Sequence, residues 1–383
     1  MTITLRKWQE AALQEWASRG QRGIVSVVTG GGKTVFALAC IAHARPETSL
    51  VVVPTVALLD QWWEEVAAFF DLQLDEVNVI KGRKGLRSGT INLAVLNSAA
   101  RLAEHPRTRP CMLVVDECHK AASPKFRRAL EVPKVASLGL SATPERQYDD
   151  GLQEVLEPAL GPVIYEYSYA AALRDEVIVP FELRNVVFEL EDERQADYDK
   201  LTQSIARCIS KEGAESEKAI ALMLKRARVL NLSLNRVKLA LKLVASHPRS
   251  QILVFHEDID ACEVIHEVLC ENGVLSGVYH SRMPLRERAV VLLRYRRSEL
   301  RVLVTCRALD EGFNVPETEV GIIAASTATR RQRIQRLGRI LRPATGKSAA
   351  IIYSLVATGP EISRLKAEEA DLEGVAGVSW SRA

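Results

Sequence analysis

No apolar run in the 383 residues reaches the roughly 18 that a membrane-spanning helix requires, and the opening MTITLRKWQE lacks the features of a signal peptide. The seven cysteines include no Cys-x-x-Cys pair, which argues against a disulfide framework or a zinc site. The formal net charge is only +3, so a nucleic-acid partner would have to be recognised through a local basic cluster. With 47% hydrophobic and 26% charged residues, the sequence predicts a folded cytoplasmic protein without a membrane partner.

Short apolar runs alternate with helical patterns along most of the chain. A strand of a parallel sheet that helices cover on both faces is apolar throughout rather than at every second position. The sequence therefore predicts an α/β fold with two parallel-sheet domains in tandem. The candidate strands are 23–28, 50–54, 91–96, 111–116 and 135–140 in the first group, and 251–256, 274–280, 301–306, 319–325 and 349–356 in the second.

The segment between the two groups has a different pattern. Residues 181–190 (FELRNVVFEL) alternate and predict a strand that leads out of the first domain, whereas 191–235 are charged, glycine-poor and helical in pattern. We therefore expect four regions, and the last of them should be a helix and a frayed tail. The expected bounds are 1–180 for the first domain, 181–240 for a linker with a helical insertion, 241–360 for the second domain and 361–383 for the tail.

The stretch VVTGGGKTVFAL (27–38) predicts a phosphate-binding loop between a strand and a helix. Glycines allow backbone N–H groups to converge on phosphate oxygens, and the start of the helix adds partial positive charge. Val27 stands where the strict pattern has glycine, so a glycine-rich turn before a core helix is the alternative. Lys33 would reach the β- and γ-phosphates, and Thr34 would ligate Mg²⁺. The proposed loop residues are Thr29, Gly30, Gly31, Gly32, Lys33 and Thr34.

The apolar stretch CMLVVDECHK (111–120) ends in two carboxylates. Phosphoryl transfer needs one group for the metal and one for the attacking water, so Asp116 would hold Mg²⁺ through water and Glu117 would orient or deprotonate the nucleophile. An ordinary acidic strand end is the alternative, but the carboxyl ends of parallel strands share one edge of the sheet with the phosphate loop. His119 can also be interpreted as a surface or capping histidine.

Several motifs occur in a fixed order. TGGGKT, DECH and LGLSATPER (138–146) resemble motifs I, II and III of superfamily 2 helicases and translocases. VVVPTVALLDQWWEEV (51–66) resembles motif Ia, and LRKWQEAAL (5–13) is similar to the start of the XPB-like branch. ILVFHE (252–257), VLVTCRALDEGFNVPE (302–317) and QRIQRLGRILRP (332–343) are similar to motifs IV, V and VI. The resemblance covers nearly the whole chain apart from 190–240 and the tail.

The resemblance implies two RecA-like domains with ATP and Mg²⁺ between them. Lys33 and Glu117 would act from the first domain and two arginines of motif VI, Arg339 and Arg342, from the second, where they would stabilise charge on the γ-phosphoryl group. The neighbouring Arg333 and Arg336 would have a supporting or solvated role. Further implied nucleotide contacts are Arg6 and Gln9, which read the adenine, and Asp310 and Gly312 of motif V; the residues implied to couple hydrolysis to movement are His119, Ser141, Thr143 and Gln335.

The resemblance also implies a nucleic-acid path across both domains, on the face away from the nucleotide. Thr55, Arg282 and Thr305 are our candidates for contacts to the phosphate backbone, because hydroxyls and arginines suit phosphate oxygens without reading sequence. For Arg282 a solvated surface position is the alternative. The partner would be duplex or forked DNA, with a nuclease or another protein as a possible second partner.

The leading hypothesis is an ATP-dependent DNA helicase or double-strand translocase. An RNA helicase is an alternative, since DECH also occurs in that class. A slow ATP-dependent switch, or a motor subunit that needs a partner protein, is a second alternative. An ATPase assay with duplex DNA, single-stranded DNA, RNA or no nucleic acid separates these hypotheses.

Overall fold

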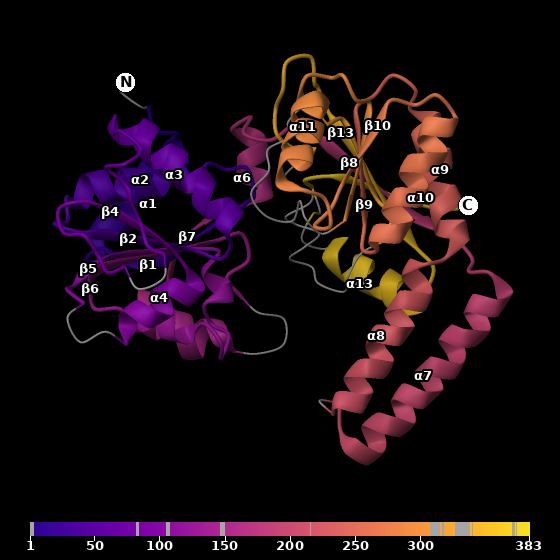
Figure 1. The fold of residues 1–383 in the computed structure, drawn as a ribbon, viewed down its shortest axis with the longest axis horizontal. Helices are drawn as coiled ribbons and strands as arrows, with labels where there is room; N and C mark the ends of the chain where they lie inside the picture. Colours follow the sequence, from indigo (N-terminus) through magenta and orange to yellow (C-terminus); the bar gives the residue numbers. More distant parts are fainter. Residues whose placement is uncertain are drawn as a thin grey trace. The chain divides into compact units, whose positions relative to one another are not determined.

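A computed structural model describes residues 4–81, 84–104, 108–145, 150–214, 216–306, 315, 318–325, 338, 340–369, 372 and 374–383. The chain divides into two compact units, Met1–Asp175 and Glu176–Ala383 (Figure 1). Each unit contains one parallel sheet of seven strands, so the predicted α/β class is confirmed for both.

The first sheet has the strand order β3-β4-β2-β5-β6-β1-β7. Its central strands β2 and β5 are buried at every position, as expected where helices cover both faces. All five strands predicted for this domain are present, and the structure adds the short β3 and the less buried edge strand β7. The strands are β1 (Arg22–Val27), β2 (Ser49–Val53), β3 (Asn78–Val79), β4 (Ile91–Val95), β5 (Cys111–Asp116), β6 (Lys134–Ser141) and β7 (Val163–Tyr167).

Two helices of this unit begin shortly after the carboxyl ends of β1 and β2. Gly32 precedes α2, and Thr55 caps α3 by accepting a hydrogen bond from the backbone N–H of Leu58 at 3.3 Å. The helix α3 ends at Phe70, because Asp71, the next residue, has a φ of 55° that stops helical propagation. The helices are α1 (Lys7–Ser18), α2 (Lys33–Ala44), α3 (Val56–Phe70), α4 (Leu96–Ala103), α5 (Glu157–Leu160) and α6 (Tyr169–Arg174).

The second sheet has the strand order β10-β11-β9-β12-β13-β8-β14. Its centre is again apolar and buried, and the helices α9 (Leu234–Ser246) and α10 (Ile259–Glu271) pack on it through Val237, Ala240, Val244, Cys262 and Ile265. The five strands predicted for this domain are all present. The strands are β8 (Phe181–Val187), β9 (Ile252–His256), β10 (Ser276–Tyr279), β11 (Val302–Cys306), β12 (Val320–Ile323), β13 (Ala350–Val356) and β14 (Gly377–Arg382).

Two expectations about this unit are corrected. Residues 181–187 form a strand as predicted, but β8 belongs to the second sheet, between β13 and β14, rather than leading out of the first domain. The end of the chain is not a frayed tail, because 377–382 pair with β8 as the parallel strand β14. Alternation along a strand reports which side chains are buried, and it carries no information about which sheet the strand joins.

The helical segment predicted for 191–235 forms a long antiparallel pair, α7 and α8, that extends away from the sheet of its own unit (Figure 1). Ser216 and Ser233 cap the helices α8 and α9 through their side-chain oxygens. The α-helices among the described residues of the unit are α7 (Asp192–Glu212), α8 (Glu217–Asn231), α9 (Leu234–Ser246), α10 (Ile259–Glu271), α11 (Leu285–Arg296) and α13 (Gly359–Glu369).

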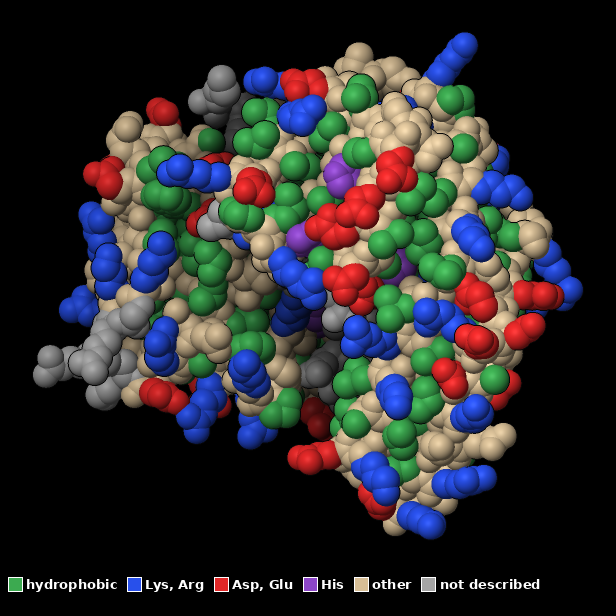
Figure 2. Space-filling view, turned by 45° about the vertical axis from the view of Figure 1, so that its right-hand side comes forward, with side chains coloured by type: hydrophobic (Ala, Val, Ile, Leu, Met, Phe, Trp, Pro, Cys, Tyr) green, Lys and Arg blue, Asp and Glu red, His purple; other side chains and the backbone are tan. Residues whose placement is uncertain are grey.

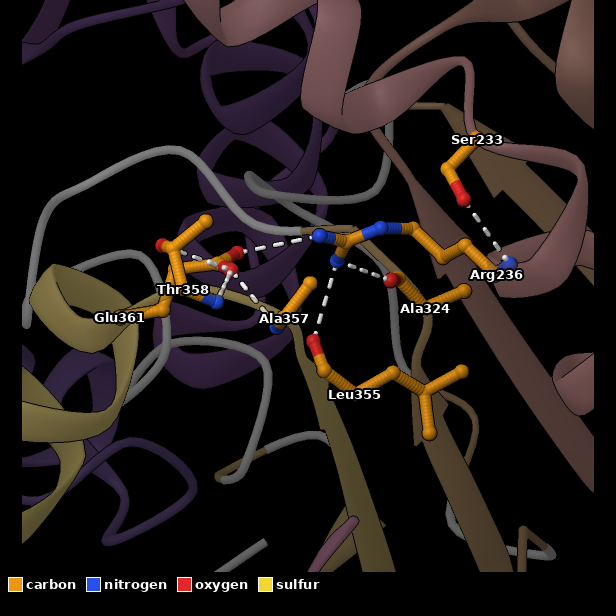
Figure 3. A network of polar contacts seen from close by, with 7 residues as sticks. All are labelled: Ser233, Arg236, Ala324, Leu355, Ala357, Thr358 and Glu361. Atoms are coloured by element: carbon orange, nitrogen blue, oxygen red, sulfur yellow. Dashed lines mark hydrogen bonds and ion pairs between the residues drawn. The ribbon is translucent and has the colours of Figure 1, made fainter. Parts of the chain in front are cut away.

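A fully buried arginine ties α9 to the carboxyl ends of two strands (Figure 3). Arg236 donates from Nη1 to the carbonyls of Ala324 at 2.6 Å and Leu355 at 3.0 Å, and from Nη2 to Glu361 Oε1 at 3.1 Å. The other oxygen of Glu361 accepts from the N–H groups of Ala357 and Thr358 and from the Thr358 hydroxyl. The network therefore joins α9, β12, β13 and the start of α13.

Candidate nucleotide site

The glycine loop between β1 and α2 adopts a conformation that side chains would block. Gly30 and Gly32 have φ values of 87° and 98°, a region that residues with a Cβ rarely occupy. A Cβ on Gly31 would lie 2.5 Å from Val27 Cγ1 and 3.0 Å from the carbonyl oxygen of Val28. The loop therefore requires glycine at consecutive positions, as the sequence pattern predicted.

Side chains from the start of α1 hold this loop from one side. Arg6 and Trp8 both donate to the carbonyl of Gly31, at 3.1 and 3.2 Å, and Gln9 Nε2 donates to the carbonyl of Gly32 at 3.0 Å. Gln9 Oε1 in turn accepts from the backbone N–H of Arg6 at 2.8 Å. Arg6 and Gln9 therefore lie against the loop, and their role in reading adenine stays a prediction.

Sequence reasoning missed Trp8, which adds an aromatic support to the same loop. Its ring stacks on Tyr167 with centroids 4.9 Å apart and also contacts Phe36 at 5.4 Å. The tryptophan in the segment LRKWQEAAL was a signal for such a contact, because a buried tryptophan needs an acceptor for its indole N–H.

Lys33 at the start of α2 forms a buried ion pair with Glu117 at the end of β5. Lys33 Nζ lies 2.8 Å from Glu117 Oε1, and both side chains are little exposed. Burial alone would lower the pKa of Lys33, yet the charges of Glu117 and Asp116 outweigh it and raise that pKa above its usual value. The sequence prediction that these residues share one edge of the sheet is geometrically correct.

Asp116 is held by hydrogen bonds to both of its carboxylate oxygens. The indole N–H of Trp62 donates to Oδ2 at 2.9 Å, and the backbone N–H of Glu117 donates to Oδ1 at 2.9 Å. Burial raises the pKa of Asp116 to about 6, although the charge of Lys33 acts in the opposite direction. Sequence reasoning missed the contribution of Trp62.

Glu117 occupies an unusual backbone conformation, with φ 47° and ψ 49°. Non-glycine residues rarely adopt this region, and such positions cluster at functional sites. Burial would raise the pKa of Glu117, but the charges of Lys33 and His119 and the Lys33 hydrogen bond together lower it to about 2. Its Oε2 atom is buried and accepts no hydrogen bond among the described residues.

Motifs II and III are joined by a buried contact. His119 Nδ1 lies 2.9 Å from Ser141 Oγ, and the backbone N–H of Thr143 donates to the same oxygen at 3.1 Å. His119 also lies 3.5 Å from Glu117 Oε2. The side chain of His119 is only 1% exposed, so the alternative interpretation of a surface histidine is wrong. A contact chain thus runs from Glu117 through His119 to the end of β6.

The residues present fit ATP and Mg²⁺. The glycine loop leaves space where a Cβ would clash, and Lys33 supplies a cation at its end. Two buried acceptors, Thr29 Oγ1 and Glu117 Oε2, have no hydrogen-bond partner among the described residues. Hydroxyl and carboxylate oxygens, as in Thr34 and Asp116, are the ligands that Mg²⁺ prefers. The predicted nucleotide residues of the first unit therefore converge on one place.

The three predicted nucleic-acid contacts differ in exposure and in their partners. Thr55 sits at the N-terminus of α3, where its hydroxyl serves as the cap. Arg282 is exposed and pairs with Asp260 at 2.8 Å. Thr305 is fully buried near the end of β11, so the prediction of a direct contact by its side chain is not supported. On the face that Figure 2 presents, basic and acidic side chains intermingle, in keeping with the low net charge.

Part of the second unit's predicted site lies outside the described residues, namely Asp310, Gly312, Gln335 and Arg339. Arg342 is described and half-buried, and Lys347 Nζ donates to its carbonyl at 2.9 Å. Just before it, Ile340 packs on β12 at Gly321, where an added Cβ would lie 2.1 Å from Ile340 Cδ1. The absence of a side chain at Gly321 thus sets how closely the end of motif VI approaches the sheet.

Two protein families match this chain. Residues 2–146 match the family described as "Type III restriction enzyme, res subunit", and residues 235–344 match "Helicase conserved C-terminal domain". The chain is 28% identical to "DNA 3'-5' translocase XPB2" of Sulfurisphaera tokodaii, over 95% of this chain and 84% of that protein. The chain is thus similar to proteins of the XPB-like branch of the superfamily 2 helicases. None of the described helices of this XPB-like chain is both long and apolar enough to span a bilayer.

Other relatives are longer than this XPB-like chain. "DNA 3'-5' helicase XPB" of Mycobacterium tuberculosis is 27% identical over 92% of this chain, and its namesake from Kineococcus radiotolerans is 27% identical over 92%. The matches span 60% and 59% of those proteins, so the chain covers less than two thirds of their length.

Solved structures agree on the fold. The "ATP-dependent Type ISP restriction-modification enzyme LlaBIII bound to DNA" matches 100% of this chain and 31% of its own, with a TM-score of 0.69 and 14% identity. "S. cerevisiae Dbp5 bound to RNA and ADP BeF3" matches 98% of this chain and 89% of its own, with a TM-score of 0.61 and 15% identity. The two units are therefore the two RecA-like domains predicted from the sequence motifs.

Proposed function

We propose that this chain is an ATP-dependent DNA helicase or double-strand translocase that moves in the 3'-5' direction. The observation that carries the proposal is the buried group of Lys33, Asp116 and Glu117 beside a loop that only glycine can form. The names of the XPB-like relatives support DNA as the partner and 3'-5' as the direction. ATP and Mg²⁺ are the proposed cofactors.

In this proposal, Lys33 exchanges partners when ATP binds. Its ammonium group now pairs with Glu117, and the γ-phosphate of ATP would offer a stronger and more highly charged acceptor. Release of Lys33 would free the Glu117 carboxylate to accept a proton from the attacking water. The ion pair would thus keep the base inactive until nucleotide fills the loop.

Asp116 and Thr34 would hold Mg²⁺, which when bound neutralises charge on the phosphates. Arg339 and Arg342 would contribute positive charge from the second domain, so hydrolysis would require both domains. His119 and Ser141, which touch each other, would pass changes at Glu117 to the end of β6. Each of these roles extends the motif resemblance to the atoms of this chain.

The decisive test is the ATPase rate measured with duplex DNA, forked DNA, single-stranded DNA, RNA and no nucleic acid. We expect stimulation by duplex or forked DNA. Stimulation by RNA alone would overturn the assignment in favour of an RNA helicase. Equal, slow rates under all conditions would favour a switch, or a motor subunit that needs a partner protein such as a nuclease.

The direction of movement has a separate test. The chain is loaded on DNA substrates that carry streptavidin at either the 3' or the 5' end of one strand, and ATP-dependent displacement is followed. We expect faster displacement from the 5' end, toward which a 3'-5' motor moves. Faster displacement from the 3' end would contradict the proposed direction while leaving the ATPase assignment intact.

A further inference from the structure

The indole of Trp62 forms a buried hydrogen bond to the carboxylate of Asp116. Trp62 lies on α3 within the motif Ia segment, is fully buried, and donates from Nε1 to Asp116 Oδ2 at 2.9 Å. An indole N–H is a donor only and carries no charge, so it fixes the direction of a carboxylate oxygen without neutralising it. The bond joins two segments that are 54 residues apart in the sequence.

The two hydrogen bonds to Asp116 together define the plane of its carboxylate. Oδ1 accepts from the backbone N–H of Glu117, and Oδ2 accepts from Trp62. Each carboxylate oxygen has further lone-pair capacity, so both can still face a water or a cation. Asp116 is 5% exposed, and in such a poorly solvated setting a directional hydrogen bond holds its geometry more firmly than in water.

Groups that hydrogen-bond to metal-binding residues orient these residues, and their loss typically weakens metal affinity by about 10–100-fold. We propose that Trp62 is a positioning residue for Asp116 and sets the affinity of the site for nucleotide-bound Mg²⁺. This inference rests on the proposed function, because it takes Asp116 as a holder of Mg²⁺. Trp62 would then have a chemical role in addition to its packing in the core.

The chain offers a closely matched control in Trp16. This residue is also fully buried in the first unit, and its Nε1 donates to the backbone carbonyl of Ser137 at 3.0 Å. Ser137 lies toward the start of β6, whereas the site lies at the opposite ends of the parallel strands. Trp16→Phe therefore removes a buried indole bond of similar length, with similar loss of packing, but away from Asp116.

The test compares the full-length wild-type chain with Trp62→Phe and Trp16→Phe. A fluorescent ATP analogue is titrated in EDTA and then at increasing Mg²⁺ concentrations. For Trp62→Phe we expect about a 10-fold rise in the Mg²⁺ concentration that gives half-maximal enhancement of binding, with affinity in EDTA changed less than about 2-fold. Trp16→Phe should leave both quantities at their wild-type values.

A second variant separates the N–H group from the shape of the ring. Benzothienylalanine at position 62 replaces the indole N–H by sulfur and keeps the bicyclic ring, so it should fold where Phe does not. It should reproduce the Mg²⁺ shift of Trp62→Phe. Wild-type Mg²⁺ dependence in this variant, or equal shifts in the Trp62 and Trp16 variants, would overturn the inference alone. A wild-type chain that binds the analogue without any Mg²⁺ dependence would overturn the inference together with the proposed function.

Discussion

Among the described residues, each unit buries a group of opposite charges, and the two groups differ in which buried atom lacks a hydrogen-bond partner. In the second unit both oxygens of Glu361 accept hydrogen bonds, one of them from Arg236 Nη2. Arg236 Nη1 makes two more contacts, to backbone carbonyls, and only its Nε lacks an acceptor among the described residues. In the first unit Lys33 pairs with Glu117 Oε1, whereas Glu117 Oε2 lies 3.5 Å from His119 Nδ1 and accepts no hydrogen bond among the described residues. We infer that the first group is built for an exchange of partners, whereas the second holds strands and helices in place.

The pKa shifts of the buried carboxylates also differ between the two groups. For Glu361, burial would raise the pKa, but Arg236 and the backbone N–H groups lower it, so this carboxylate is stabilised as an anion. The neighbours Asp116 and Glu117 are shifted in opposite directions, with pKa values of about 6 and about 2. Adjacent carboxylates with divergent pKa values are typical of sites where each has a separate role.

The largest expected effect comes from Glu117→Gln. The amide keeps the size of the side chain but cannot accept a proton, so steady-state ATP hydrolysis should fall by about 10²–10⁴-fold. Binding of a fluorescent ATP analogue should persist, because the loop and Lys33 are unchanged. Glu154→Gln, a substitution at an exposed residue of the same unit, is the control and should retain wild-type turnover. Normal turnover in the Glu117 variant would refute its assigned role.

The second effect concerns stability rather than turnover. Arg236→Met leaves Glu361 as a buried, unpaired anion, which should destabilise the second unit by about 3–5 kcal/mol. Hydrogen–deuterium exchange should speed up in β12 and β13 and remain unchanged in β1 and β5. The control is Arg184→Met, which removes a partly exposed pair with Glu182 and a hydrogen bond to Tyr353, and it should cost about 1 kcal/mol. Equal effects of the two variants would show that the buried Arg236 group stabilises the second unit no more than the pair at Arg184 does.

A smaller effect should appear as a pH dependence. The folded pKa of Glu361 is lowered below the unfolded value of about 4.3, so its contribution to stability is complete above that value. The contribution is lost as the pH falls from about 4.3 through the lower folded pKa. The difference in unfolding free energy between wild type and Glu361→Gln should therefore be constant near neutrality and shrink in acid. A difference that persists unchanged in acid would contradict the lowered pKa.

The smallest effect is expected at Arg282. Its ion pair with Asp260 is exposed, so Arg282→Ala should change the unfolding free energy by less than about 1 kcal/mol. If Arg282 contacts a DNA phosphate, the salt dependence of DNA binding should lose about one unit of slope in a log–log plot. Asp260→Asn is the control and should not reduce that slope. An unchanged slope in the Arg282 variant would leave this residue as a solvated surface arginine.

Much of the fold could be predicted from the sequence because buried parallel strands are apolar along their whole length. The central strands β2 and β5 are the clearest cases. The strands that were missed or misplaced lie toward the edges, where β7 and β14 are partly exposed and carry mixed side chains. The placement of β8 depends on pairing with distant segments, and no local pattern encodes that pairing.

The residues of the candidate site could also be predicted only in part from the sequence. Glycines, Lys33 and the two acidic residues were identified because their spacing follows from the shape of a phosphate group and the ligands of a metal ion. The sequence did not identify Trp8, Trp62 and Arg236, because each of them acts through a contact with a residue 23 or more positions away. A tryptophan or arginine in an apolar segment shows only that an acceptor must exist, and the fold decides which one.

The position of β8 has a consequence for the synthesis of this chain. Phe181 pairs with Ala350, 169 residues later (350 − 181), so the strand leaves the ribosome long before its neighbour β13 exists. At about 5–20 residues per second, the delay is roughly 10–30 s. During that time the helices α7 and α8 can form from local contacts, while β8 presents unpaired backbone groups. We therefore expect the nascent second domain to expose this strand edge until β13 has been made, and closure of this long loop to slow its folding.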